Sequence, residues 1–337
     1  MYSPVGCDAL IFRLYLDPMI TSPAPRRSAL TLGLLAGILA VSTAAIFIRF
    51  AQHEGAASIV VAAARLTISS LILAPFALTH YWSHLRRLSR REWILALLSG
   101  LFLALHFATW ITSLEYTSVA SSVVLVTTTP LWVALLAPLV LRERVGTAAV
   151  VGLILALTGG FVVGLSDACT WAGPSTMLRA GSVSCPPLRT FFGGTAFLGD
   201  FLAIFGAWMA AGYMLVGRKL RVKMELVPYI FVVYTMAAVV LMAIMLGMGE
   251  NPLGLPPLAY LWFALLALVP QLFGHSTFNW ALKYLPASFV SVTLLGEPVG
   301  STILAYFIFQ EQPGWVKIGG AVLILAGIWL AARGEKK

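Results

Sequence analysis

Ten long apolar runs dominate the chain, and short segments with charged or turn-forming residues separate them. Most runs hold the roughly 20 residues that an α-helix needs to cross ~30 Å of hydrocarbon. The pattern predicts an all-α polytopic membrane protein with ten transmembrane helices. The runs cover residues 30–51, 57–79, 92–113, 118–140, 146–165, 195–217, 226–247, 258–281, 287–309 and 315–332.

The run at 287–309 carries a carboxylate and a helix breaker near its middle, Glu297 followed by Pro298. Proline lacks a backbone donor, and its ring disturbs the carbonyl four residues earlier. We therefore expect the helix to be kinked or opened here, with backbone polar groups that need a protein or water partner. Such a position is expected to face a cavity and not lipid.

The same frame occurs 168 residues earlier, where Thr129 and Pro130 stand in place of Glu297 and Pro298. The further matches are Glu143 with Glu311, Gly146 with Gly314, Gly152 with Gly320 and Gly159 with Gly327. Each copy holds five predicted helices, an odd number, so the second copy enters the membrane from the opposite side. This predicts two inverted five-helix repeats. The expected divisions are an N-terminal tail (1–29), a first repeat (30–165), an extracytoplasmic linker loop (166–194) and a second repeat (195–333).

The loop charges predict the orientation, because cytoplasmic loops hold the excess of Lys and Arg. If the chain starts inside, all Lys and Arg fall on the cytoplasmic side except Arg49, Arg65, Arg179, Arg189 and Lys317. We therefore expect a multi-pass protein of the inner (plasma) membrane with both termini cytoplasmic.

The composition agrees with this assignment. With 60% hydrophobic and 10% charged residues and a mean hydropathy of +0.91, the chain is too apolar for a soluble globule. Orientation in the bilayer explains the net charge of +9, so no nucleic-acid partner is expected.

Two segments carry a resemblance to a known family. Residues 116–145 contain Thr-Thr-Thr-Pro-Leu-Trp and then Leu-Arg-Glu-Arg-Val, and residues 294–313 contain Gly-Glu-Pro and then Phe-Gln-Glu-Gln-Pro. Over about residues 30–333 the chain resembles EamA-type transporters of the drug/metabolite transporter superfamily, and the two segments are similar to the family's fourth and ninth helices. Arg65 lies where such proteins often have an arginine in the second helix. The chain differs at Val41-Ser42-Thr43, where many members have Trp-Gly, and in its long linker loop.

Glu297 and Arg65 are the ionisable residues closest to the middle of the predicted bilayer. A charge there costs at least ~2.5–3.5 kcal/mol on insertion scales, so each needs a partner, a cavity or water. One reading is a site for solute or for a coupling proton. The other is a structural ion pair or carbonyl cap that fixes helix packing.

Polar residues cluster on the third and eighth predicted helices, which correspond in the two repeats. They are His106, Thr109 and Trp110 in the first, and Gln271, His275 and Asn279 in the second. Offsets of three, four and eight place each set on one helix face, which we expect to line the cavity. The alternative is a set of interhelical hydrogen bonds. Tyr213, Tyr234 and Trp280 either line the same cavity or are core aromatics.

Four residues outside the predicted cavity complete the candidates. Glu143 and Glu311 end their helices at opposite membrane faces and are expected to bond the backbone or a neighbouring loop. Cys169 and Cys185 both lie in the linker loop, where a disulfide and two free thiols are both open. No metal site is expected. His80 and His84 have an i,i+4 spacing that could hold a metal, but no further histidine motif supports it, and the cysteines show no metal-binding spacing.

The resemblance implies a secondary transporter of a small metabolite or of an amino-acid-like or amphipathic solute. We expect alternating access around a mid-membrane cavity, with export driven by a proton or by exchange. The alternatives are a non-transporting scaffold or receptor and an intramembrane enzyme. No P-loop, GxSxG or HExxH motif occurs, so neither ATP drive within this chain nor an enzyme is expected. The expected partners are a small solute and the lipid bilayer, with a homodimer left open, and no cofactor is expected.

Overall fold

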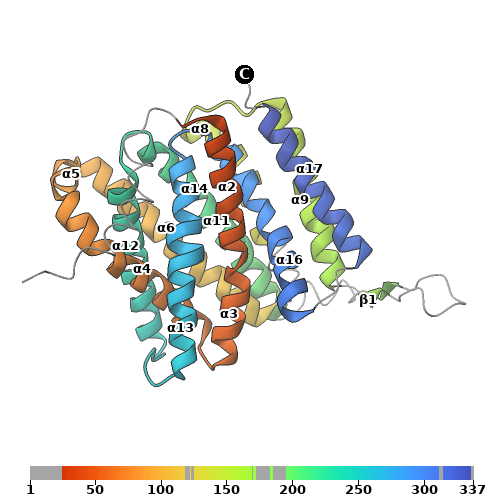
Figure 1. The fold of residues 1–337 in the computed structure, drawn as a ribbon, viewed down its shortest axis with the longest axis horizontal. Coiled ribbons are helices and arrows are strands. Elements are labelled where there is room, and N and C mark those ends of the chain that lie inside the picture. Colours follow the sequence, from red (N-terminus) through yellow and green to blue (C-terminus); the bar gives the residue numbers. More distant parts are fainter. Residues whose placement is uncertain are drawn as a thin grey trace, which may run out of the picture.

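The computed structural model describes residues 25–117, 122, 125–168, 170–171, 183–184, 195–310 and 314–334, and these form a bundle of helices (Figure 1). The helices of the first half are α2 (Arg27–Ser42), α3 (Ala44–His53), α4 (Ser58–His80), α5 (Trp82–Arg87), α6 (Arg90–Tyr116), α8 (Thr129–Val140) and α9 (Thr147–Ala168). Those of the second half are α11 (Thr195–Arg221), α12 (Leu226–Gly247), α13 (Pro257–Leu266), η1 (Ala267–His275), α14 (Ser276–Ala281), α15 (Ala287–Thr293), η2 (Leu294–Gly296), α16 (Glu297–Phe309) and α17 (Trp315–Gly334).

Eight stretches of helix among the described residues are long and apolar enough to cross a membrane. Two shorter apolar helices, Thr129–Val140 and Thr147–Val163, coincide with the remaining predicted runs. The prediction of an all-α membrane protein is therefore confirmed. The exception is a short antiparallel pair, β1 (Thr170–Trp171) with β2 (Val183–Ser184), in the segment predicted as a loop.

The two halves interleave and do not form separate lobes. Helix α4 packs on α12, α6 packs on α11, and α2 packs on η1. At one side of the bundle α9 runs along α17 (Figure 1). Each of these pairs joins one helix of the first half to one of the second, so the core of the bundle lies at the junction of the halves.

Glycines allow the backbones of α9 and α17 to touch. A Cβ atom added to Gly152 would lie 2.5 Å from the carbonyl oxygen of Gly327, and one added to Gly159 would lie 2.6 Å from that of Gly320. Small residues permit this close approach, which is a common way for membrane helices to associate. Because Gly152 faces the later glycine and Gly159 the earlier one, α9 and α17 run antiparallel.

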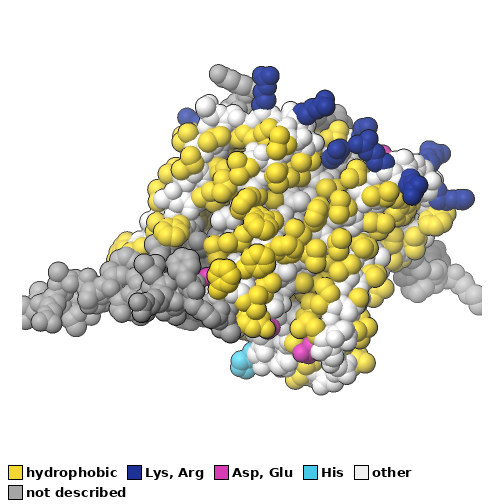
Figure 2. Space-filling model, turned by 180° about the vertical axis from the view of Figure 1, so that it is seen from behind, with side chains coloured by type: hydrophobic (Ala, Val, Ile, Leu, Met, Phe, Trp, Pro, Cys, Tyr) yellow, Lys and Arg dark blue, Asp and Glu magenta, His cyan; other side chains and the backbone are white. Residues whose placement is uncertain are grey.

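On the face that Figure 2 shows, apolar side chains cover most of the described surface, while Lys and Arg side chains gather along one end. Large apolar side chains lie exposed on several helices, including Leu139 at 78% and Phe307 at 67%. Exposed apolar area of this extent is unfavourable in water and suits a lipid environment. The chain is a multi-pass membrane protein with this surface against the bilayer.

Candidate functional site

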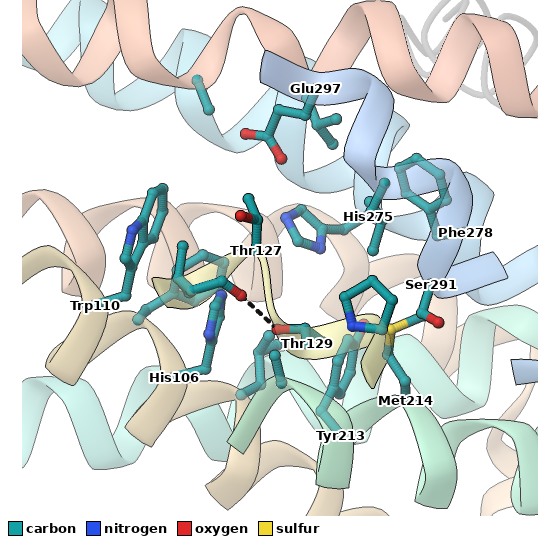
Figure 3. Close-up of a pocket in the computed structure, with 18 of the residues that line it drawn as sticks. His106, Trp110, Thr127, Thr129, Tyr213, Met214, His275, Phe278, Ser291 and Glu297 are labelled. Atoms are coloured by element: carbon teal, nitrogen blue, oxygen red, sulfur yellow. Dashed lines mark hydrogen bonds between the residues drawn. The ribbon is translucent and has the colours of Figure 1, made fainter. Parts of the chain in front are cut away.

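A cavity of about 110 Å³ lies inside the bundle, between helices of both halves (Figure 3). The first half contributes residues of α2, α3, α4 and α6 and the segment 126–130. The second half contributes residues of α11, η1, α14, α15, η2 and α16. One buried water needs roughly 10–15 Å³ by the same kind of measure, so the cavity has room for several waters or a small solute.

The helix predicted to break beside Pro298 does so. Helix α15 ends at Thr293, the 3-10 turn η2 follows, and α16 begins at Glu297. Pro298 thus lies in the first turn of α16, where its missing N–H removes no hydrogen bond of the helix. The hydroxyl of Ser42 donates to the carbonyl oxygen of Glu297 at 3.2 Å. The carboxylate of Glu297 points into the cavity (Figure 3).

The matching position in the first half has the same form. Helix α8 begins at Thr129 with Pro130 in its first turn, directly after a turn at Thr127 and Thr128. The hydroxyl of Thr129 donates to the carbonyl oxygen of Val126 at 2.8 Å. Two short helices therefore begin at the cavity wall, and only α16 has an acid at its first residue.

Arg65 lies in the cavity wall and is 1% exposed. Its Nε donates to Oε1 of Gln271 at 2.7 Å, and its guanidinium carbon lies 4.4 Å from the centroid of the Phe107 ring. Neither Nη1 nor Nη2 has a hydrogen-bond partner among the described residues. Glu297 also lines the cavity, yet over the described part of the chain no ion pair joins the two. The direct contacts of the guanidinium are therefore with two uncharged side chains, Gln271 and Phe107.

The two predicted cavity histidines lie in the wall on opposite halves. His106 has Nδ1 at 2.9 Å from the carbonyl oxygen of Gly206, and its ring stacks on Trp110 with centroids 5.9 Å apart. His275 meets Phe107 edge to face at 5.6 Å between centroids. Trp110 also lines the cavity, and its Nε1 has no partner among the described residues.

Of the other residues predicted for this face, Asn279 lies in the cavity wall and Gln271 does not. Asn279 donates from Nδ2 to the hydroxyl of Tyr213 at 2.6 Å. Gln271 is fully buried beside Arg65, on the π-helical turn η1. Pro270 lies inside η1, where its missing N–H and bulky ring disfavour an ordinary α-turn. Thr109 bonds the carbonyl oxygen of Leu105 at 2.7 Å and is absent from the wall.

Several wall residues were missed or left undecided from the sequence. Thr127 and Ser291 were not predicted, although each lies within seven residues of a helix-breaking proline, which is the signal that would have found them. Tyr213 lies in the wall, whereas Tyr234 and Trp280 are buried elsewhere. Val41 at the end of α2 and Ala44 at the start of α3 also lie in the wall.

A group of hydrogen bonds, named here the Arg218 cluster, ties four helix ends together at one end of the cavity. Arg218 donates from Nε to Oε1 of Glu143 at 2.6 Å. Its Nη1 donates to the carbonyl oxygens of Leu282 at 2.8 Å and Lys283 at 3.1 Å. Oε2 of Glu143 accepts from the backbone N–H of Ala287 at 3.2 Å. Because Leu282 lines the cavity, the cluster lies next to it.

Glu311, Cys169 and Cys185 lie outside the described residues. Within the described ranges no group of three or more His, Cys, Asp or Glu residues could hold a metal ion.

Comparisons with known proteins find similarity over most of the chain. A sequence model described as the EamA-like transporter family matches residues 28–165 and again 197–333. An uncharacterized transporter of Archaeoglobus fulgidus is 23% identical over 255 residues, which are 74% of this chain and 80% of that protein. A solved structure titled only as a crystal structure of a protein matches with a TM-score of 0.72 and 19% identity, covering 92% of this chain and all of that one. At this identity the solved structure supports the fold alone.

Proposed function

The chain belongs to the EamA-like transporter family, and we propose on this premise that it is a secondary transporter of a small solute. In this proposal one central cavity opens to each side of the plasma membrane in turn. The observation that carries it is the cavity at the junction of the two halves. Arg65 and Glu297 lie in its wall without pairing to each other.

The proposal includes ten transmembrane helices in two inverted repeats, and the packing supports it. Equivalent helices of the two halves meet, α4 with α12 and α9 with α17. The latter pair is antiparallel through Gly152 with Gly327 and Gly159 with Gly320. Reciprocal contact of equivalent residues is expected around a two-fold axis that lies in the membrane plane.

The roles proposed for the wall residues follow from their positions. Arg65, His106, Trp110, His275 and Asn279 contact the solute, Gln271 holds Arg65, and Glu297 serves coupling. Pro130 and Pro298 lie in the first turns of α8 and α16, which begin at the cavity wall. We propose export as the direction, driven by a proton or by exchange.

The orientation is tested by single cysteines in a background without Cys7, Cys169 and Cys185. Arg86, on the short helix α5, and Leu253, between α12 and α13, are both exposed, and the proposal places them on opposite sides of the membrane. We expect a membrane-impermeant thiol reagent to label Leu253→Cys but not Arg86→Cys in intact cells, because the basic loop is cytoplasmic. Labelling of Arg86→Cys alone would mean that both termini are outside.

Transport itself is tested by flux. Metabolite profiling of overexpressing and deleted cells supplies candidate solutes, and purified protein in proteoliposomes is then assayed for their uptake down an imposed gradient. We expect saturable flux that empty vesicles lack. A receptor or scaffold would bind a solute without moving it, and an enzyme would alter it chemically, so either result would contradict the proposal.

A further inference from the structure

Arg65 presents two unused groups at the cavity. Its side chain is buried, and its Nε is already bonded to Gln271. Nη1 and Nη2 have no hydrogen-bond partner among the described residues. A buried donor without a partner is unfavourable, and more so when it is charged. Such a group in a cavity wall needs a ligand that the protein itself does not supply.

The polar groups around Arg65 are mostly engaged with one another. Nδ1 of His106 is bonded to Gly206, and the Tyr213 hydroxyl accepts from Asn279. The wall atoms buried without a partner in the described structure are all donors: Nη1 and Nη2 of Arg65 and Nε1 of Trp110. A surplus of donors favours a ligand rich in acceptors.

The guanidinium is held in a fixed orientation. Gln271 holds it through Nε, and the Phe107 ring lies 4.4 Å from its central carbon. A guanidinium fixed in this way offers a planar fork that fits the two oxygens of a carboxylate, with shorter and stronger bonds than neutral pairs make. The start of α8 adds to this preference, because a helix N-terminus favours negative charge and α8 has no acid in its first turn.

We propose that the transported solute carries a carboxylate joined to an apolar body, and that Nη1 and Nη2 of Arg65 bind this carboxylate. The inference rests on the proposed transport function and specifies its substrate class. The apolar body contacts the wall formed by Leu103, Phe107, Met214 and Phe278. Glu297 lines the same cavity and forms no ion pair within the described ranges, so it can receive an ammonium group if the solute carries one.

The first experiment uses matched probes with the purified full chain in detergent, and calorimetry measures the dissociation constants. The acids are 4-methylpentanoate and 3-phenylpropionate, each compared with its primary amide, which has the same shape without the charge. We expect each acid to bind about 10- to 100-fold more tightly than its amide, as loss of a charged hydrogen-bond pair implies. Equal binding of acid and amide, or no binding of either acid, would overturn the inference.

Leucine and phenylalanine distinguish the two sources of a carboxylate, since they are close analogues of the same acids with an added ammonium. Tighter binding of the amino acids, lost in Glu297→Gln, identifies a zwitterionic solute. Tighter binding of the plain acids identifies a simple organic anion. Both results agree with a carboxylate site at Arg65, which the variants test.

Variants then test the residue. Arg65→Gln should remove the preference for acid over amide, and Arg65→Lys should reduce it because an ammonium lacks the fork. The matched control is Arg221→Lys, at a second arginine that is 1% exposed but bonded to the carbonyl oxygens of Asn279 and Met224 and absent from the wall. It should retain the full preference. If Arg65→Gln does not fold, the ratio of the amide and acid dissociation constants is compared between Arg65→Lys and the wild type. An unchanged ratio in Arg65→Lys overturns the inference.

Failure of this inference can be told from failure of the proposed function. Flux of a solute without any anionic group would leave transport in place and refute the carboxylate site. Arg65-dependent acid binding without flux of any solute would leave the site in place and refute transport.

Discussion

Replacement of Glu297 by glutamine is expected to abolish pH-driven flux while binding of the solute carboxylate at Arg65 largely remains. Glutamine keeps the size of the side chain and removes its titration. Glu297 lies at the start of α16 with its carboxylate toward the cavity (Figure 3). A carboxylate in this position can bind a proton on one side and release it on the other as the cavity alternates. We therefore expect flux to fall to the level of empty vesicles under an imposed pH gradient.

The control for this experiment is Glu225→Gln, at an acid outside the cavity that lies 3.3 Å from Nε2 of His84. It makes the same change of charge and should leave pH-driven flux intact. Normal pH-driven flux in well-folded Glu297→Gln protein would refute the coupling role. Exchange of labelled for unlabelled solute, measured without a gradient, would then show whether transport proceeds without a proton.

The alternative role for Glu297, a structural ion pair with Arg65, predicts a different effect on thermal stability. Removal of one partner of a buried ion pair leaves the other charge buried without a partner. The summed loss of stability of the two single variants would then exceed the loss in the double variant. The described structure joins Arg65 to Gln271 and not to Glu297. We therefore expect the stability effects of Glu297→Gln and Arg65→Ala to be close to additive in thermal unfolding.

Much of the fold could be predicted because its causes are local. Apolar runs of membrane length predicted the helices, and Pro298 predicted the break that the structure has at Leu294–Gly296. The repeat frame matched glycines of α9 with glycines of α17, but could not show that these residues touch. Their contact depends on how the helices pack, which a one-dimensional pattern does not specify.

The cavity was predictable only in part. Arg65 and Glu297 could be identified from the sequence, because an ionisable side chain within an apolar run is costly in a membrane and therefore indicates a functional or structural role. The bond from Arg65 to Gln271 joins residues 206 positions apart, and it depends on α4 lying against the π-turn around Pro270. The offsets of an ordinary α-helix placed Gln271 with His275 and Asn279 on one cavity face, whereas Gln271 lies behind the wall.

The Arg218 cluster gives the second large expected effect, because it lies beside the cavity through Leu282. It joins the ends of α8, α11, α14 and α15 through one guanidinium and one carboxylate. The Arg218 and Glu143 side chains are only 17% and 19% exposed. In the proposed alternating access the cavity opens on the side where the cluster lies, and these hydrogen bonds are expected to break in that state. A substitution that removes them should therefore favour the state that is open at this end.

Arg218→Gln removes the charge and the fork that holds the two carbonyl oxygens. Hydrogen bonds to charged groups contribute about 1.5–3 kcal/mol each, and ~1.4 kcal/mol changes an equilibrium tenfold. Ser291→Cys places a thiol in the cavity wall. We expect an impermeant reagent added on the side of the cluster to react with this thiol about tenfold faster in the Arg218→Gln protein than in the protein that keeps Arg218. Lys219→Gln is the control, because this exposed neighbour makes the same charge change outside the cluster. Equal labelling rates in the Arg218→Gln and Lys219→Gln proteins would show that the cluster stabilises the fold without gating the cavity, since opening would then not depend on its bonds.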